Sequence, residues 1–247
     1  MRFKNKTVLI IGGSSGIGLA TAKKYANDNA NVLIVGKTED TLKKAVIEIG
    51  NNTRFFIADI SKVSSIESLY KQLNEKAVRI DVLIVCAGLG KFGSVDEVNE
   101  IDYDLVMNTN TKGTFFVVKI LKNIINEGGN IILLSSFLAN KFIPLTAVLS
   151  ASKIAVETFT KIFARELIEN NIRVNAVSPG SIKTNFMNVA NPSENQQKRL
   201  GENMPKIPLG KRGEVDQIAN TILFLSSEEA NYINGAILSV DGGLSTT

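Results

Sequence analysis

The chain has 247 residues, of which 44% are hydrophobic and 21% are charged, a balance typical of a globular protein. It contains no histidine, which excludes a Ser-His-Asp triad and most catalytic zinc or iron sites, and we expect no metal. The net charge of +4 is spread along the chain without a basic tract, which argues against a nucleic-acid partner.

A single cysteine, Cys86, excludes an internal disulfide framework and fits a reducing compartment. The residues before the first apolar run are polar, and no apolar stretch approaches the roughly 18 residues that a membrane helix needs. We therefore expect a cytoplasmic protein with no membrane partner.

Short apolar runs alternate with longer amphipathic segments along the whole chain. The runs, which predict strands, are residues 7–11, 31–35, 54–58, 81–85, 130–134, 173–177 and 236–240. The amphipathic segments, which predict helices, are residues 16–29, 39–49, 63–76, 103–126, 150–170 and 215–226. Strands that are apolar throughout are buried on both faces, as in a parallel sheet. The pattern predicts one α/β domain over residues 1–247, with a Rossmann-type doubly wound parallel sheet of about seven strands.

A glycine-rich turn joins the first predicted strand to the first predicted helix. It reads Gly12-Gly13-Ser14-Ser15-Gly16-Ile17-Gly18. Glycines in such a turn permit a tight bend, close approach to a pyrophosphate and close helix packing, while the helix N-terminus offers oriented N–H groups. The order of strand, turn and helix favours a dinucleotide site.

With this turn, the chain resembles the short-chain dehydrogenase/reductase family, and the resemblance covers essentially its whole length. Further matches follow in family order: Asp59, Ala87-Gly88, Asn110, Ser136, Lys153, residues 175–180, Thr184 and Asp241-Gly242-Gly243. The resemblance implies a nicotinamide dinucleotide held by Gly12, Ser14, Ser15, Gly16, Ile17, Gly18, Lys37, Asp59, Ile60, Ala87, Gly88, Lys153, Pro179, Gly180, Ile182 and Thr184.

The end of the second predicted strand bears on which coenzyme binds. An acid there would accept hydrogen bonds from the adenosine ribose and repel a 2'-phosphate, but this chain has Lys37. A lysine pairs with that phosphate as a point charge. We therefore expect NADP(H) as the preferred cofactor, and NAD(H) stays open.

The family's active site is a Tyr-x-x-x-Lys pair with a serine thirteen residues before the tyrosine. Thirteen residues after Ser136 stands Leu149, four residues before Lys153. A spacing of four puts Leu149 and Lys153 on one helix face, so a leucine occupies the position of the family tyrosine. The resemblance makes Ser136, Lys153 and Asn110, with Leu149 at the tyrosine position, the catalytic set.

Two functions remain open without that tyrosine. The first is an NADP(H)-dependent oxidoreductase acting on a small or medium carbonyl or alcohol, with a proton from Thr146 or from a water held by Asn110 and Lys153. The second is a catalytically silent nucleotide-binding pseudoenzyme that acts as a sensor, scaffold or partner subunit. Non-redox chemistry is disfavoured, because family members that adopted it typically lost the glycine turn and kept the tyrosine.

We expect a small-molecule substrate to bind above the nicotinamide, under a lid at about residues 185–210. The apolar side chains expected to surround it are Leu89, Phe92, Phe137, Leu138, Phe142, Phe186, Met187, Val189 and Met204.

Two further expectations concern packing. The predicted helices at about 103–126 and 150–170 are apolar on more than one stripe, so we expect a homo-oligomer, a dimer or tetramer, through them. In this chain Ile11 stands where the family's glycine turn begins with a threonine, and Val85-Cys86 stands where the family has an Asn-Asn pair. We expect these residues to meet, because joint loss of polar groups leaves no buried donor unpaired.

Overall fold

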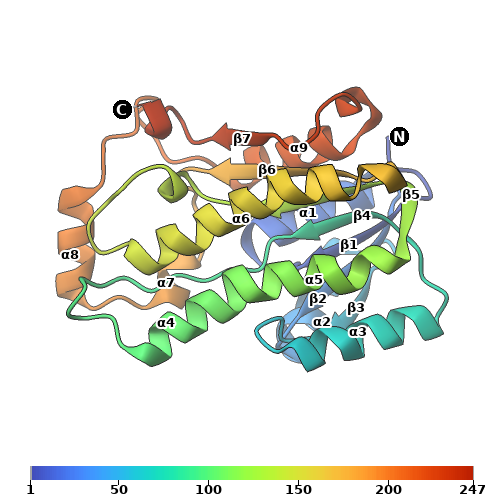
Figure 1. Ribbon diagram of the computed structural model, residues 1–247, viewed down its shortest axis with the longest axis horizontal. Helices are drawn as coiled ribbons and strands as arrows, with labels where there is room; N and C mark the ends of the chain where they lie inside the picture. The colour runs from blue at the N-terminus through green and yellow to red at the C-terminus, as the bar shows by residue number, and fades with distance from the viewer. Residues whose placement is uncertain (1, 247) are drawn as a thin grey trace.

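The strands of the computed structural model form one parallel sheet in the order β3-β2-β1-β4-β5-β6-β7 (Figure 1). They are β1 (Thr7–Ile11), β2 (Asn31–Gly36), β3 (Arg54–Ile57), β4 (Ile80–Val85), β5 (Ile125–Leu134), β6 (Arg173–Pro179) and β7 (Ile237–Val240). The structure describes residues 2–246, so the two end residues of the predicted 1–247 domain lie outside the described part. From β1 the sheet extends to β2 and β3 on one side and to β4, β5, β6 and β7 on the other. The C-terminal ends of β1 and β4 therefore form the topological switch point of a doubly wound sheet. The predicted fold class is confirmed.

Helices cover both faces of the sheet. One face carries α1 (Gly16–Asn27), α2 (Glu39–Ile49) and α9 (Val215–Ser226), and the other carries α3 (Val63–Glu75), α5 (Thr114–Leu121) and α6 (Ala147–Glu166). Alternate strand residues supply the two cores: Val8 and Ile10 belong to the first, and Leu9 and Ile11 to the second. Burial on both sides explains why these strands are apolar throughout.

The helix predicted at 103–126 is interrupted in the structure. It begins as α4 (Glu100–Val106), continues as a π-helix (Met107–Gly113) and ends with α5 at Leu121. Residues 125 and 126 belong to β5, because Ile125 pairs with Ile80 ahead of an irregularity in the ladder. The helix predicted at 150–170 is α6, which starts at Ala147 and ends at Glu166.

The segment 185–210, the predicted lid, contains two helices although no helix is predicted there from the sequence. They are α7 (Phe186–Ala190) and α8 (Glu194–Asn203), and α8 begins with a capping box between Ser193 and Gln196. Both lie at the end of the sheet toward which the strands point (Figure 1). They pack on a third apolar cluster that includes Phe92, Leu149 and Leu200. Within the described residues, no helix is long and apolar enough to cross a membrane.

Candidate active site

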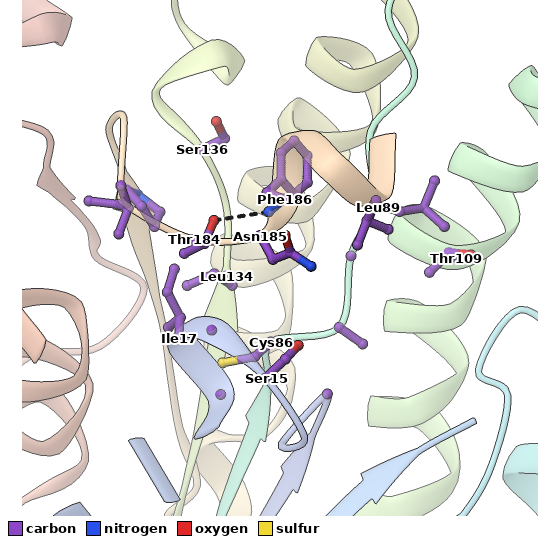
Figure 2. Close-up of a pocket in the computed structure, with 18 of the residues that line it drawn as sticks. Ser15, Ile17, Cys86, Leu89, Thr109, Leu134, Ser136, Thr184, Asn185 and Phe186 are labelled. Carbon is purple, nitrogen blue, oxygen red and sulfur yellow. Dashed lines mark hydrogen bonds between the residues drawn. The ribbon is translucent and has the colours of Figure 1, made fainter. Parts of the chain in front are cut away.

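A cavity of about 460 Å³ opens at the C-terminal ends of β1 and β4. Every residue that the family resemblance assigns to the cofactor lines it. Figure 2 shows Ser15 and Ile17 at one side of this cavity, Ser136 and Phe186 at the other, and Thr184 between them. One continuous site therefore has a half at the glycine turn and a half at Ser136.

The glycine turn presents bare backbone to the cavity. Gly12 and Gly16 have φ of +83° and +51°, the left-handed region that favours glycine. A Cβ on Gly12 would lie 2.6 Å from the nitrogen of Ala87, and one on Gly18 would lie 2.1 Å from the oxygen of Gly12. In the described structure the Ser15 hydroxyl, at the N-cap of α1, makes no cap bond to that helix. The first N–H groups of α1 are left for an anion, so the cradle fits a dinucleotide pyrophosphate.

Polar residues follow the neighbouring strands β2 and β3 at the rim of the cavity. The Lys37 side chain is exposed there. The Asp59 carboxylate accepts hydrogen bonds from the main-chain N–H of Ser61 at 3.1 Å and from its hydroxyl at 2.7 Å. Beside it, the main-chain oxygen of Ile60 would lie 2.7 Å from a Cβ on Gly113. This close approach explains a glycine where the π-helix meets the rim.

Lys153 reaches the cavity from α6. Its Nζ donates a hydrogen bond to the main-chain oxygen of Leu134 at 2.7 Å, and the residue is 7% exposed. Burial lowers the pKa of the Lys153 ammonium to about 8, because desolvation disfavours the charged form. A Cβ on Gly88 would lie 3.3 Å from this Nζ. The Lys153 ammonium therefore lies between the end of β5 and the loop after β4.

Asn110 lies behind the cavity wall, in the π-helix. Its amide donates to the main-chain oxygen of Leu89 at 2.8 Å and to the Ser152 hydroxyl at 3.0 Å. Its carbonyl accepts the N–H of Leu89 at 3.0 Å. Asn110 is not among the described residues that line the cavity. Its bonds hold Leu89 against Ser152 of α6. Positioning is the role that this geometry supports for it.

Ser136 and Leu149 line the same cavity as Lys153. The Ser136 oxygen accepts the N–H of Leu138 at 3.2 Å, which leaves the hydroxyl proton for a ligand. Leu149 is 2% exposed and lies in the first turn of α6, one turn before Lys153. The prediction that Leu149 and Lys153 share a helix face is confirmed.

Two sequence expectations about the cavity are wrong. The Thr146 hydroxyl donates to the main-chain oxygen of Ile143 at 2.7 Å and lies 2.9 Å from the Ser150 hydroxyl. Thr146 is 2% exposed and stabilises the turn before α6, so it does not reach the cavity as a proton donor. Phe142 is 87% exposed and lies outside the cavity, because its loop turns Ile143 inward instead.

The other apolar residues predicted for the substrate region do line the cavity. They are Leu89, Phe92, Phe137, Leu138, Phe186, Met187, Val189 and Met204, and Leu149 and Leu200 join them. Four separate segments of the chain supply them: the loop after β4, the turn after β5, α6 and the segment 185–210.

Sequence reasoning missed five polar residues of the cavity wall: Thr109, Ser135, Ser181, Asn185 and Arg212. Ser135 donates to the Glu157 carboxylate at 2.8 Å, and Arg212 donates to the main-chain oxygen of Ile182 at 2.6 Å. Each partner lies more than twenty positions away in sequence, so no local pattern reveals these bonds. The one available signal was the polar Ser135-Ser136 pair that directly follows a predicted strand.

The turn after β1 meets the end of β4 as expected. Ile11 pairs with Val85 in the sheet, and its main-chain oxygen accepts the N–H groups of Cys86 and Ala87, each at 2.9 Å. Burial raises the pKa of the Cys86 thiol to about 12. A thiol so far from ionising serves as a small apolar side chain.

Known proteins resemble the chain over its full length. The family model described as enoyl-(acyl carrier protein) reductase matches residues 12–245. The 3-oxoacyl-(acyl-carrier-protein) reductase FabG of Thermotoga maritima is 34% identical over 249 residues, which cover 99% of each chain. A short-chain dehydrogenase/reductase of Pestalotiopsis microspora is 33% identical, covering 98% of this chain and 96% of that one. The crystal structure of levodione reductase has a TM-score of 0.89 at 31% identity and covers 100% of both chains.

The fold and the cavity define a doubly wound α/β protein whose glycine turn fits a dinucleotide. The similarities place it more narrowly: the chain belongs to the short-chain dehydrogenase/reductase family. The cofactor of this family is a nicotinamide dinucleotide, NAD(H) or NADP(H).

Proposed function

We propose that the protein is an NADP(H)-dependent oxidoreductase acting on a small or medium apolar carbonyl or alcohol, with Leu149 at the position of the family tyrosine. One observation carries this proposal. The glycine turn, Ser136, Leu149 and Lys153 line a single cavity together with the apolar side chains of Phe92, Phe137, Leu138 and Phe186. The segment 185–210 serves as the lid of this cavity.

The preference for NADP(H) rests on Lys37. Its exposed side chain stands at the end of β2, the strand whose end meets the adenosine ribose in nucleotide-binding sheets of this type. An ammonium there attracts a 2'-phosphate and offers it hydrogen-bond donors. Thr184 stands over the glycine turn, because a Cβ on Gly16 would lie 3.6 Å from its methyl group.

Lys153 is the proton source in this proposal. A bound nicotinamide supplies the hydride in reduction and accepts it in oxidation. As negative charge develops on the carbonyl oxygen, the Ser136 hydroxyl donates a hydrogen bond to it, and the Lys153 ammonium transfers a proton to it. The neutral amine then recovers a proton from solvent. A pKa of about 8 suits this exchange, because both forms of Lys153 are accessible near neutral pH.

The other available donors support the same assignment. The Thr146 hydroxyl is occupied outside the cavity, and the Ser135 hydroxyl donates to Glu157. The Asn110 amide is held by Leu89 and Ser152. Lys153 combines an exchangeable proton with a place on the cavity wall.

The test separates binding from proton transfer. NADPH and NADH are titrated by fluorescence, and NADPH oxidation is then followed with a panel of apolar ketones for the wild type, Lys153→Met and Lys153→Arg. Arginine keeps the positive charge but does not release its proton near neutral pH. Because Lys153 is also assigned to the cofactor, we expect both variants to bind NADPH more weakly than the wild type, and to lose about 10²- to 10⁴-fold in kcat at saturating NADPH. Tight NADPH binding by a wild type that reduces no ketone would instead support the silent pseudoenzyme.

A further inference from the structure

Three segments meet at Gly90, in the loop after β4. A Cβ on Gly90 would lie 2.7 Å from Cζ of Phe186 and 3.1 Å from Cδ2 of Leu149. Phe186 opens α7, and Leu149 lies in the first turn of α6. An aromatic ring and an isobutyl group therefore rest on the same stretch of bare backbone. A side chain on Gly90 would displace the Phe186 ring.

The Phe186 ring is held from other sides as well. The Phe92 ring packs against it edge to face, with 6.4 Å between centroids and 81° between planes. The main-chain N–H of Phe186 donates to the Thr184 hydroxyl oxygen at 3.2 Å, the bond drawn in Figure 2. The ring is half-buried and lines the cavity on the side where Ser136 stands (Figure 2). Its position is thus fixed by packing as well as by the backbone of the lid.

This arrangement explains why Leu149 is almost fully buried although it lines a cavity. Leu149 and Phe186 belong to the same apolar cluster, which also contains Phe137 and Leu138. The ring fills space beside Leu149 that a substrate would otherwise enter. A phenol at position 149 is longer and wider than the leucine, and it would meet Phe186 and Gly90.

We infer that Phe186 is the specificity-determining residue of this site, an inference that rests on the proposed function. It limits the size of the apolar carbonyl compound that can approach Ser136. Together with Leu149, it also occupies the volume that a tyrosine at position 149 requires. Two consequences follow: trimming Phe186 admits bulkier ketones, and the substitution Leu149→Tyr becomes compatible with the fold only when Phe186 is trimmed.

The first experiment measures size preference. The wild type, Phe186→Ala and Phe186→Leu are assayed with NADPH and cyclic ketones that carry alkyl groups of increasing length. Phe142→Ala is the matched control, because the structure places that exposed ring outside the cavity. We expect Phe186→Ala to raise kcat/KM for the bulkier ketones, relative to the smallest, by about tenfold or more, with an unchanged Kd for NADPH. An unchanged size order in both Phe186 variants would overturn the inference.

A binding readout keeps this result separate from the proposed function. The same ketones are titrated calorimetrically into each protein saturated with NADP⁺, a complex in which no reduction takes place. If the wild type reduces no ketone, the proposed function fails, but a shift of binding toward bulkier ketones in Phe186→Ala still supports the size limit. Equal affinities for all ketones in the wild type and the variant would refute it.

The second experiment tests the shared volume by thermal unfolding. We compare the wild type, Leu149→Tyr, Phe186→Ala and the double variant Leu149→Tyr/Phe186→Ala. We expect Leu149→Tyr to lower Tm and the double variant to recover most of that loss, a coupling that independent sites would not show. A Leu149→Tyr protein with the Tm of the wild type, or a double variant whose losses simply add, would contradict the proposed contact.

Discussion

The ammonium nitrogen of Lys153 lies 2.7 Å from the main-chain oxygen of Leu134, the last residue of β5. This bond holds the amine at the C-terminal end of the sheet while burial lowers its pKa to about 8. If the ammonium supplies the proton, reduction requires the charged form. We therefore expect kcat/KM for ketone reduction to be constant below pH 8 and to fall about tenfold per pH unit above it.

Alcohol oxidation should show the opposite pH dependence, because it requires the neutral amine of Lys153 to accept a proton. Its kcat/KM should rise as the pH increases through about 8 and then level off. Lys153→Met should abolish both pH dependences together with most of the rate. If kcat/KM depended on pH in the same way in the wild type and in Lys153→Met, the titrating group would be one other than Lys153.

Lys37 provides a test of coenzyme preference. Replacing it with aspartate removes a charged partner of the 2'-phosphate and adds a carboxylate that accepts hydrogen bonds from a ribose diol. We expect Lys37→Asp to raise the Kd for NADPH about 10- to 100-fold and to lower the Kd for NADH. Lys44→Asp is the control, because it makes the same charge change on the exposed surface of α2. If both variants changed the Kd values for NADPH and NADH equally, Lys37 would act only through long-range electrostatics and not by contact with the 2'-phosphate.

An ion pair ties the lid to the loop after β4. The Arg199 guanidinium on α8 lies 2.6 Å from the Glu97 carboxylate, which also accepts the N–H of Ser94 at 2.7 Å. The Ser94 N–H and Arg199 lower the pKa of the Glu97 carboxyl, so the pair persists at neutral pH and is lost only as the pH falls through that lowered value.

Breaking this pair should loosen the lid without altering the proton donor. We expect Arg199→Met to raise KM for the ketone a few-fold and to change kcat little, because the pair is partly exposed and therefore weak. Lys71→Met, which breaks the Lys71–Glu75 pair on α3, should leave both parameters unchanged. A large fall in kcat for Arg199→Met would show that the ion pair also supports the chemistry.

The outer face of α4, α5 and α6 exposes apolar side chains, from which we predict self-association. Tyr103, Ile154 and Ile162 are 47%, 41% and 46% exposed there, and the Phe115 and Phe159 rings pack edge to face between α5 and α6. Apolar exposure of this kind on adjacent helices is typical of a protein interface. We expect a homo-oligomeric mass by light scattering.

Charge at this face should dissociate the oligomer. The double variant Ile154→Asp/Ile162→Asp is expected to run as a monomer, whereas Ile47→Asp, an equally polar change on exposed α2, should keep the wild-type mass. A monomeric wild type would refute the interface directly.

The sequence was sufficient for the sheet and for the glycine turn, because both depend on local patterns. Strands such as β1 are apolar over their full length, and Gly12 and Gly18 are required by contacts within or next to the turn. The spacing of Leu149 and Lys153 also determined their common face, since both lie in one regular helix.

Features that depend on distant partners were not predictable. Asn110, in the π-helix, bonds to Leu89 and Ser152, which lie far away in sequence. Leu145 has φ of +73°, unusual for a leucine, and its main-chain oxygen accepts the N–H of Gly93 in another loop. The Thr146 hydroxyl, which its sequence position suggested would be available, is instead engaged locally with Ile143 and Ser150 in the turn before α6.

NADPH consumption by the unmodified protein with a small apolar ketone tests the central claim most directly. We predict saturable oxidation of NADPH that requires the ketone, yields one alcohol per coenzyme and is largely lost in Lys153→Arg although NADPH still binds. Undiminished turnover in Lys153→Arg, or no turnover by the wild type with NADPH bound, would contradict a reductase that works through Lys153.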